Sequence, residues 1–287
     1  MADFRSIATT NFATSEVSSL VITKPAGLAV GDLMVAILSK SDAINSQDSD
    51  INTASGWTLR GETKFNDSDG ELNIQTKVAA SGDVAAGNFT FTTDNPCFVG
   101  GAIVAVSDPA SGGEFQSIEM DSTGSVTVLS NTSALTPLVA NTLIIVAIAS
   151  QTGSDTTTST FTSTPSITFT ERADFVRDSV QDDPSLAIAT GVHTGTAEIT
   201  AYGATLSNAA LTASSLILIN PQVNATAAVS PMDVPPAING AVATNDVSLD
   251  VGHMDTEPVV NGLISKKTPT PWRNPDKPST DWDNLPK

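Results

Sequence analysis

The sequence predicts an all-β protein: a jelly-roll-like antiparallel β-sandwich with an internal duplication, followed by an extended C-terminal arm. Short apolar runs and period-two alternation recur through residues 1–220, and Gly, Asn, Asp, Pro and Ser separate them. No segment longer than two helical turns has apolar residues at helical spacing. Short strands at this density are typical of two antiparallel sheets packed face to face.

The first copy of the duplication is predicted over residues 12–110. Its five strand-like runs are residues 32–39, 56–59, 72–78, 88–92 and 102–107. Residues with turn chemistry lie between these runs, for example at 67–70 and 94–96. The pattern therefore predicts five strands joined by turns.

The second copy is predicted over residues 125–220. Its runs are residues 141–150, 166–170, 186–192, 198–201 and 215–220, each roughly 110 residues after its counterpart. Either one sandwich with two equivalent halves or two sandwiches in tandem fits this pattern. We expect one closed unit over residues 1–220, because five or six strands standing alone would leave unprotected sheet edges.

The character of the chain changes after residue 220. Residues 221–262 are rich in Ala, Val, Asn and Pro, and their apolar fragments are too short for a core. Prolines at 231, 235, 236 and 258 interrupt these fragments. We expect an extended connector here.

The predicted C-terminal arm, residues 263–287, carries a ten-residue repeat. The repeated motif is Trp-x-Asn-x-x-Lys, formed first by Trp272, Asn274 and Lys277 and then by Trp282, Asn284 and Lys287. Five prolines within residues 266–287 disfavour a helix or an interior strand and favour an extended, polyproline-like chain. Such a chain has no core in which to bury two indole rings, so these six residues are predicted to bind a partner protein. A disordered tail with incidental tryptophans is the alternative.

The net charge of the chain, and the patterns of its N-terminus and apolar runs, limit the classes of partner that we expect. The chain has 31 acidic and 13 basic residues, so its field repels phosphate backbones and anionic lipids. Nucleic acid and membrane are therefore not expected partners. The N-terminus lacks the pattern of a secretory signal, and the longest apolar run, residues 143–149, is too short to span a membrane.

The single Cys97 is expected to be a buried, unreactive thiol.

The residues that commonly perform catalysis do not form a recognisable constellation, and we expect no enzyme. His193 and His253 are the two histidines, and His193 is expected at the surface or in a turn. The sequence has no Gly-x-Ser-x-Gly elbow and no His or Cys pair at metal spacing. Glycosidases need two facing carboxylates and usually aromatic platforms, but aromatic residues are 5% of the chain.

Two acidic segments are the best candidates for a metal site. Asp67, Asp69 and Glu71, together with the stretch of residues 42–50, form oxygen-rich loops of the kind that hold Ca²⁺. Their spacing does not fit an EF-hand, and solvated turns explain the same residues. We therefore expect no cofactor, with these three residues as the calcium alternative.

Several segments carry a resemblance to a known group of proteins. Residues 19–36, the Gly-Trp-Thr at 56–58, residues 88–92 and residues 101–106 resemble a module common in proteins of tailed bacteriophages. The terminal Trp-x-Asn-x-x-Lys repeat is similar to short C-terminal repeats in phage proteins.

This resemblance implies a virion component such as a capsid decoration protein, a head fibre or a tail fibre. On this reading we expect a protein that is made in the host cytoplasm, resides in the virion, forms a homo-oligomer and has other virion proteins as partners. The alternatives are a receptor- or glycan-binding fibre module and an enzyme that releases sugar or peptide fragments.

Overall fold

The computed structural model describes residues 2–42, 48–67, 69–107, 115–152, 156–177 and 183–221. The chain divides into two units, Met1–Ala227 and Ala228–Lys287, and all described residues belong to the first. The predicted arm, and the predicted connector after its first residue, lie outside the described residues.

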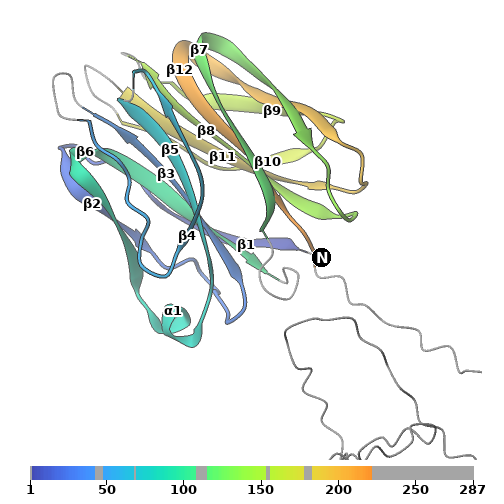
Figure 1. The fold of residues 1–287 in the computed structure, drawn as a ribbon, viewed down its shortest axis with the longest axis horizontal. Coiled ribbons are helices and arrows are strands. Elements are labelled where there is room, and N and C mark those ends of the chain that lie inside the picture. Colours follow the sequence, from blue (N-terminus) through green and yellow to red (C-terminus); the bar gives the residue numbers. More distant parts are fainter. Residues whose placement is uncertain are drawn as a thin grey trace, which may run out of the picture. The chain divides into compact units, whose positions relative to one another are not determined.

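Each half of the described chain builds one six-stranded antiparallel sheet (Figure 1). The strands of the first sheet are β1 (Asp3–Thr10), β2 (Val17–Thr23), β3 (Leu33–Ser41), β4 (Thr58–Phe65), β5 (Gly70–Val78) and β6 (Asn88–Ser107). A short helix, α1 (Ser81–Ala85), lies between β5 and β6. The strands of the second sheet are β7 (Phe115–Leu135), β8 (Thr142–Thr152), β9 (Thr158–Thr164), β10 (Phe169–Val176), β11 (Asp183–His193) and β12 (Ile199–Ile219).

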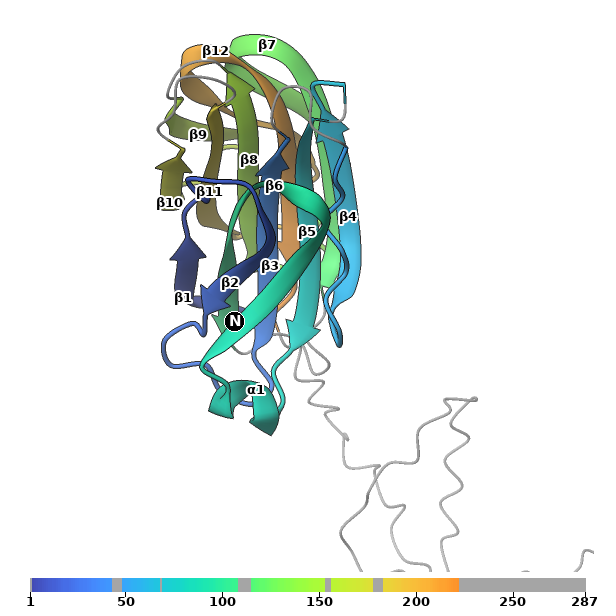
Figure 2. The ribbon, with the colours of Figure 1, turned by 90° about the vertical axis from the view of Figure 1, so that its left-hand side faces the viewer.

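The two sheets share one strand order. The first runs β1-β6-β3-β5-β4 and the second runs β7-β12-β8-β11-β10, so β3 and β8 are the central strands. Contacts between the sheets join β4 to β7 on one side of the sandwich, and Figure 2 shows β1 near β10 on the other. The sheets therefore face each other in reversed order, as a pseudo-two-fold axis that runs between β3 and β8 and exchanges them would produce.

The strand register repeats with the strand order. Val35 of β3 pairs with Thr76 of β5, and Ile145 of β8 pairs with Thr190 of β11. The equivalent positions lie about 110 residues apart in sequence, the spacing predicted for the duplication. The internal duplication therefore extends to individual residue pairs.

The halves share a central hydrophobic core between the two sheets. It includes Val35, Ile37 and Val104 from the first sheet and Ile145 and Ile217 from the second, all fully buried. Burying a side chain of this size stabilises a fold by about 1.5–3 kcal/mol. Neither sheet has another cover for this inner face in the described part of the chain, so the halves form one sandwich and not two in tandem.

Two long strands also cover the outer faces of the sandwich. The N-terminal half of β6 pairs with β2, and these strands enclose a second core around Phe91, Ile22 and Trp57. Correspondingly, the N-terminal half of β12 lies between β7 and β9 and encloses a third core around Tyr202 and Leu129. Each long strand thus belongs to two layers.

The predicted turn at residues 94–96 is wrong, because these residues lie inside β6. The pairing of β6 with β2 shifts register there: Ser19 pairs with Thr92, whereas Val17 pairs with Cys97. The turn residues are therefore extra residues of an irregularity that lets β6 leave one layer and enter the next, the usual effect of a β-bulge.

Candidate functional site

The six residues predicted to bind a partner (Trp272, Asn274, Lys277, Trp282, Asn284 and Lys287) lie outside the described residues. The candidate sites that the structure does describe are an acidic cluster, a pocket beside Arg172, and two uncharged strands at the edges of the outer layers.

The acidic cluster joins the two segments that the sequence suggested for calcium. One carboxylate oxygen from each of Asp42, Asp48 and Asp69 lies within 4.8 Å of the others. Asp42 is fully buried and forms an ion pair with buried Lys40, and its Oδ2 also accepts a hydrogen bond from the Ser49 amide at 3.0 Å. Burial raises the pKa of Asp42, while the hydrogen bond from Lys40 opposes that shift.

Glu71 is separated from this cluster by its own hydrogen bonds. Its carboxylate accepts from the Ile51 amide at 3.1 Å and from Asn73 Nδ2 at 2.9 Å, and burial raises its pKa. Gln75 continues the row, with Nε2 donating to Asn73 Oδ1 at 3.0 Å and to the Asn52 carbonyl at 3.0 Å. These alternate residues of β5 share one face of the sheet and hold residues 51–54 against it.

The grouping of the predicted calcium residues therefore differs from the sequence expectation. Asp69 joins Asp42 and Asp48, whereas Glu71 supports a loop and Asp67 is not in the carboxylate group. The Lys40 ammonium already supplies a positive charge to Asp42, which reduces the attraction of this group for a second cation. Calcium binding here stays a prediction.

The sequence also predicted how exposed Cys97 and His193 would be. Cys97 is buried and free, as predicted, and burial raises the pKa of its thiol, the opposite of what a reactive cysteine needs. The surface position predicted for His193 is wrong: it lies at the end of β11 with a 6% exposed fraction. Its Nδ1 accepts a hydrogen bond from the Gly195 amide at 3.0 Å.

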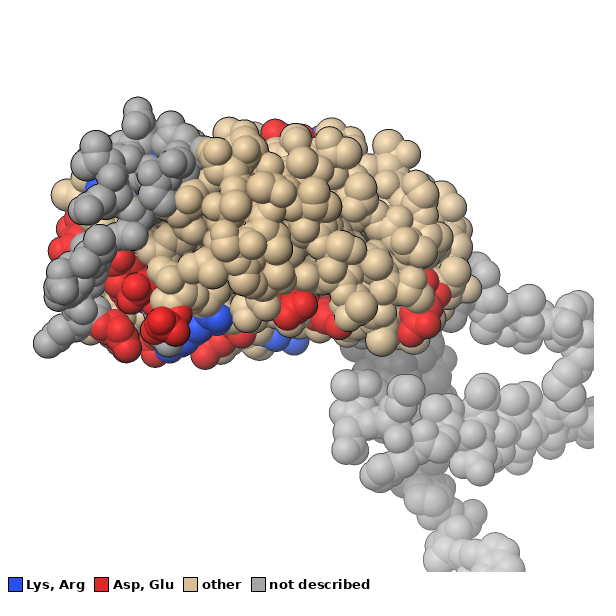
Figure 3. All heavy atoms as spheres, turned by 90° about the horizontal axis from the view of Figure 1, so that it is seen from above, with Lys and Arg blue, Asp and Glu red and all other residues tan. Residues whose placement is uncertain are grey.

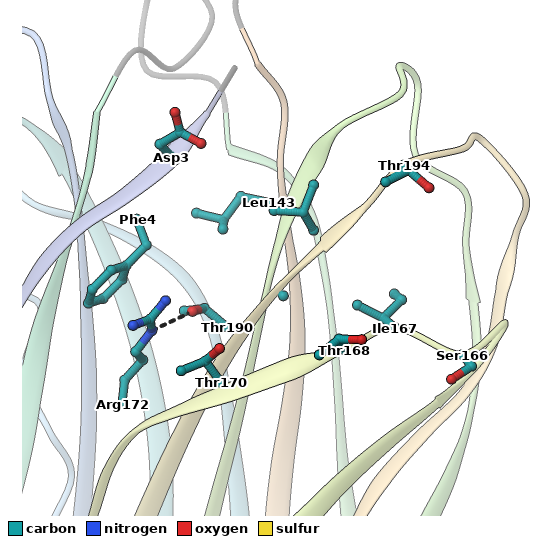
Figure 4. A pocket seen from close by; sticks show the side chains of 12 residues that line it. Asp3, Phe4, Leu143, Ser166, Ile167, Thr168, Thr170, Arg172, Thr190 and Thr194 are labelled. Atoms are coloured by element: carbon teal, nitrogen blue, oxygen red, sulfur yellow. Dashed lines mark hydrogen bonds between the residues drawn. The ribbon is translucent and has the colours of Figure 1, made fainter.

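A pocket of about 640 Å³ lies on the side of the sandwich where β1 and β10 meet (Figure 4). Hydroxyl side chains form much of its lining, from the segment that leads into β10, from β10 itself, and from the end of β11 and just beyond it. They belong to Ser166, Thr168, Thr170, Thr190 and Thr194. This volume is in the range of small-molecule sites.

One cation and one acid complete the polar part of this lining. Arg172 of β10 places its guanidinium over the Phe4 ring of β1, with its carbon 3.8 Å from the ring centroid. Its Nε donates to Thr190 Oγ1 at 2.7 Å, and burial lowers its pKa. Figure 4 shows Asp3 beside Phe4 at the opposite edge of the pocket from Thr170 and Thr190. No sequence pattern predicted this site, because its residues come from both halves and form no local motif.

Two edge strands of the outer layers carry no charged side chain. Within the described chain, β9 pairs only with β12 and β2 pairs only with β6. Their sequences are TSTFTST and VSSLVIT, without the lysine or proline that commonly protects an edge, although the pairing of β9 with β12 shifts register between Gly203 and Thr205. Figure 3 shows that the face seen from above is broad and nearly free of charge, with acidic residues mainly along its margin. Residues 122–170 contain one ionisable residue, Asp155.

The chain matches no protein-family model, and no curated protein or solved structure is significantly similar to it. In the described part of the chain, no helix has the length and apolar character needed to cross a bilayer.

Proposed function

We propose that this protein is a non-enzymatic structural component of a bacteriophage virion, on the capsid or the tail, and that residues 263–287 bind neighbouring subunits. The observation that carries the proposal is the repeated Trp-x-Asn-x-x-Lys motif on a proline-rich segment. Two indole rings at a fixed spacing fit two pockets on a partner, and tryptophans often dominate the energy of such interfaces.

The packing of the sandwich supports a partner in another subunit. The central core and both outer cores are built from described residues, including Trp57, which has an 8% exposed fraction. The described residues thus form three hydrophobic clusters among themselves, one between the sheets and one on each outer face. Binding the Trp272 and Trp282 rings to a neighbour removes them from water.

Charge also favours association between copies of the chain. Residues 1–221 contain 23 acidic and 8 basic residues, whereas residues 263–287 contain 3 acidic and 5 basic residues. An arm with a small positive charge is attracted to the acidic body of another copy or of a similar neighbour. Lys277 and Lys287, one in each repeat, are the residues we expect to contact acidic groups.

Edge strands β2 and β9 offer a second mode of contact. An extended segment can add to an unprotected strand edge, so that main-chain hydrogen bonds give affinity and side-chain pockets give register. Residues 247–251 alternate apolar and polar side chains, a pattern suited to such pairing. We propose that the connector pairs with a neighbour's edge while the two tryptophans fix the position.

Deletion of residues 266–287 tests this function. The truncated protein should keep the melting temperature of the body, and mass spectrometry of purified particles should find it lost from the virion. The variant Trp272→Ala/Trp282→Ala should reproduce the loss, whereas Thr268→Ala/Thr270→Ala, which alters the arm outside the repeat, should not. Normal incorporation of the truncated protein would refute the proposal.

A further inference from the structure

We infer that the pocket beside Arg172 binds a carboxylate-bearing, polyhydroxylated ligand, of which a hexuronate is the simplest example. This inference concerns the sandwich alone and does not depend on the C-terminal arm.

The free edge of the Arg172 guanidinium supplies the recognition of a carboxylate. Phe4 covers one face of the guanidinium, and Nε is held by Thr190 Oγ1 at 2.7 Å. In the part of the chain that the structure describes, Arg172 makes no other hydrogen bond, so both Nη groups keep their donors. A fixed guanidinium with two free donors matches a carboxylate by two parallel hydrogen bonds.

The hydroxyl side chains supply the recognition of a polyol. Ser166, Thr168, Thr170 and Thr194 line the pocket, and among the described residues their hydroxyls have no hydrogen-bond partner. Each hydroxyl can donate and accept, as ring hydroxyls of a sugar do. The carboxylate of Asp3, at the rim, can accept from a ligand hydroxyl and would repel a second negative charge, which favours a ligand with one carboxylate.

A purely structural role for Arg172 is the competing explanation, and the duplication provides its control. Arg60 makes the same contacts on the other side of the sandwich: its Nε donates to Thr76 Oγ1 at 2.7 Å, and its guanidinium lies over Phe115. If Arg172 served only to join the sheets, replacing either arginine would have the same effect on ligand binding, namely none.

The test is an NMR titration of the full-length protein with sodium D-glucuronate, D-glucose and sodium acetate. We expect glucuronate to shift the Arg172 Nε–H signal and the Thr168 and Thr170 amides at millimolar concentrations. Glucose lacks the carboxylate and acetate lacks the hydroxyls, so both should bind more weakly. Arg172→Gln should weaken glucuronate binding about tenfold to a hundredfold, because charge-assisted hydrogen bonds are lost.

Two variants keep this test decisive. Arg60→Gln should bind glucuronate as the wild type does. Arg172→Lys keeps the positive charge and should fold, but it should bind more weakly because an ammonium cannot form the paired geometry. The inference is overturned if glucuronate shifts no signal near the pocket, if Arg172→Gln binds as the wild type does, or if glucose or acetate binds as tightly as glucuronate.

Discussion

Arg60 and Arg172 are equivalent residues of the internal duplication, and each joins one sheet to the other. Arg60 lies on β4 of the first sheet and places its guanidinium over Phe115 of the second, 4.7 Å from the ring centroid. Arg172 lies on β10 of the second sheet and stacks over Phe4 of the first, at 3.8 Å. The reciprocal contacts close the two open sides of the sandwich.

The same backbone feature presents both arginines. The pairing of β4 with β5 shifts register between Leu59 and Gly61, and the pairing of β10 with β11 shifts between Glu171 and Ala173. Each arginine is thus the extra residue of an irregularity. Since β-bulges redirect side chains at sheet edges, this position lets an edge residue reach the opposite sheet.

Replacing these arginines with glutamine should destabilise the sandwich unequally. Arg172→Gln should lower the free energy of unfolding by about 1–2 kcal/mol, because it removes a partly buried cation–π contact and a hydrogen bond. Arg60 is exposed and farther from its ring, so Arg60→Gln should cost about 0.5–1 kcal/mol. Urea unfolding measures both. The double variant should show additive losses, and a large coupling between the two sites would contradict their independence.

Gln151 forms hydrogen bonds between the two halves of the sandwich, and replacing it should lower the free energy of unfolding. Its Nε2 donates to Ser41 Oγ at 2.8 Å, its Oε1 accepts from Asn66 Nδ2 at 3.1 Å, and it is 3% exposed. Gln151→Ala leaves both partners in the first half without these bonds, so we expect a loss of about 1–3 kcal/mol in unfolding free energy.

Gln116 provides the matched control for that measurement. Its Nε2 donates to the Thr136 carbonyl at 2.7 Å and its Oε1 accepts from the Leu138 amide at 3.2 Å, so this half-buried side chain bonds only within the second half among the described residues. Gln116→Ala should change the unfolding free energy by less than about 0.5 kcal/mol. Equal losses for the two variants would show that Gln151 does not link the halves.

The sequence predicted the strands of the central sheets better than those of the outer layers. Residues 32–39 and 141–150 stand out as apolar runs because β3 and β8 are buried on both faces. No strand was predicted over β1, β2, β7 or β9. The sequences of β7 and β9 are rich in Thr and Ser, mostly exposed or half-buried, and lack a regular apolar alternation. A polar strand of this kind is fixed by its partner strand and not by its own pattern.

The sites were harder to predict than the strands, because they depend on how the halves assemble. Phe4, Arg172 and Thr190 meet only after β1 and β10 face each other across the sandwich. The acidic cluster was partly foreseen, since Asp42, Asp48 and Asp69 come from the two segments suggested for calcium. The role of Glu71 was not predicted, because its hydrogen bond with the Ile51 amide forms only when β5 packs against a loop that is distant in sequence.

Cys97 should be protected from thiol reagents in the native protein. Its side chain has no exposed surface, and burial raises the pKa of the thiol, so the reactive thiolate is scarce near neutral pH. We expect negligible reaction with Ellman's reagent under native conditions and one thiol per chain in denaturant. Rapid stoichiometric labelling of the folded protein would contradict the buried position.

Asp174 should make the sandwich less stable as the pH rises from about 4 to 6. Burial is the main cause that raises its pKa to about 6 from 3.8, although its Oδ2 accepts a hydrogen bond from the Thr158 amide at 2.9 Å. Within this pH range Asp174 keeps its proton in the folded state but has released it in the unfolded state. The free energy of unfolding therefore decreases as the pH rises. Above pH 6 the folded protein carries a half-buried carboxylate at this position.

The variant Asp174→Asn removes this penalty while keeping an oxygen that can accept from Thr158. Its melting temperature should exceed that of the wild type above pH 6 and converge with it near pH 4, because the wild-type carboxyl is then protonated in the folded state. Asp121→Asn removes the same charge from an exposed site and should not produce this dependence. If Asp174→Asn were less stable than the wild type at pH 7, the ionised carboxylate would instead stabilise the junction of β9 and β10.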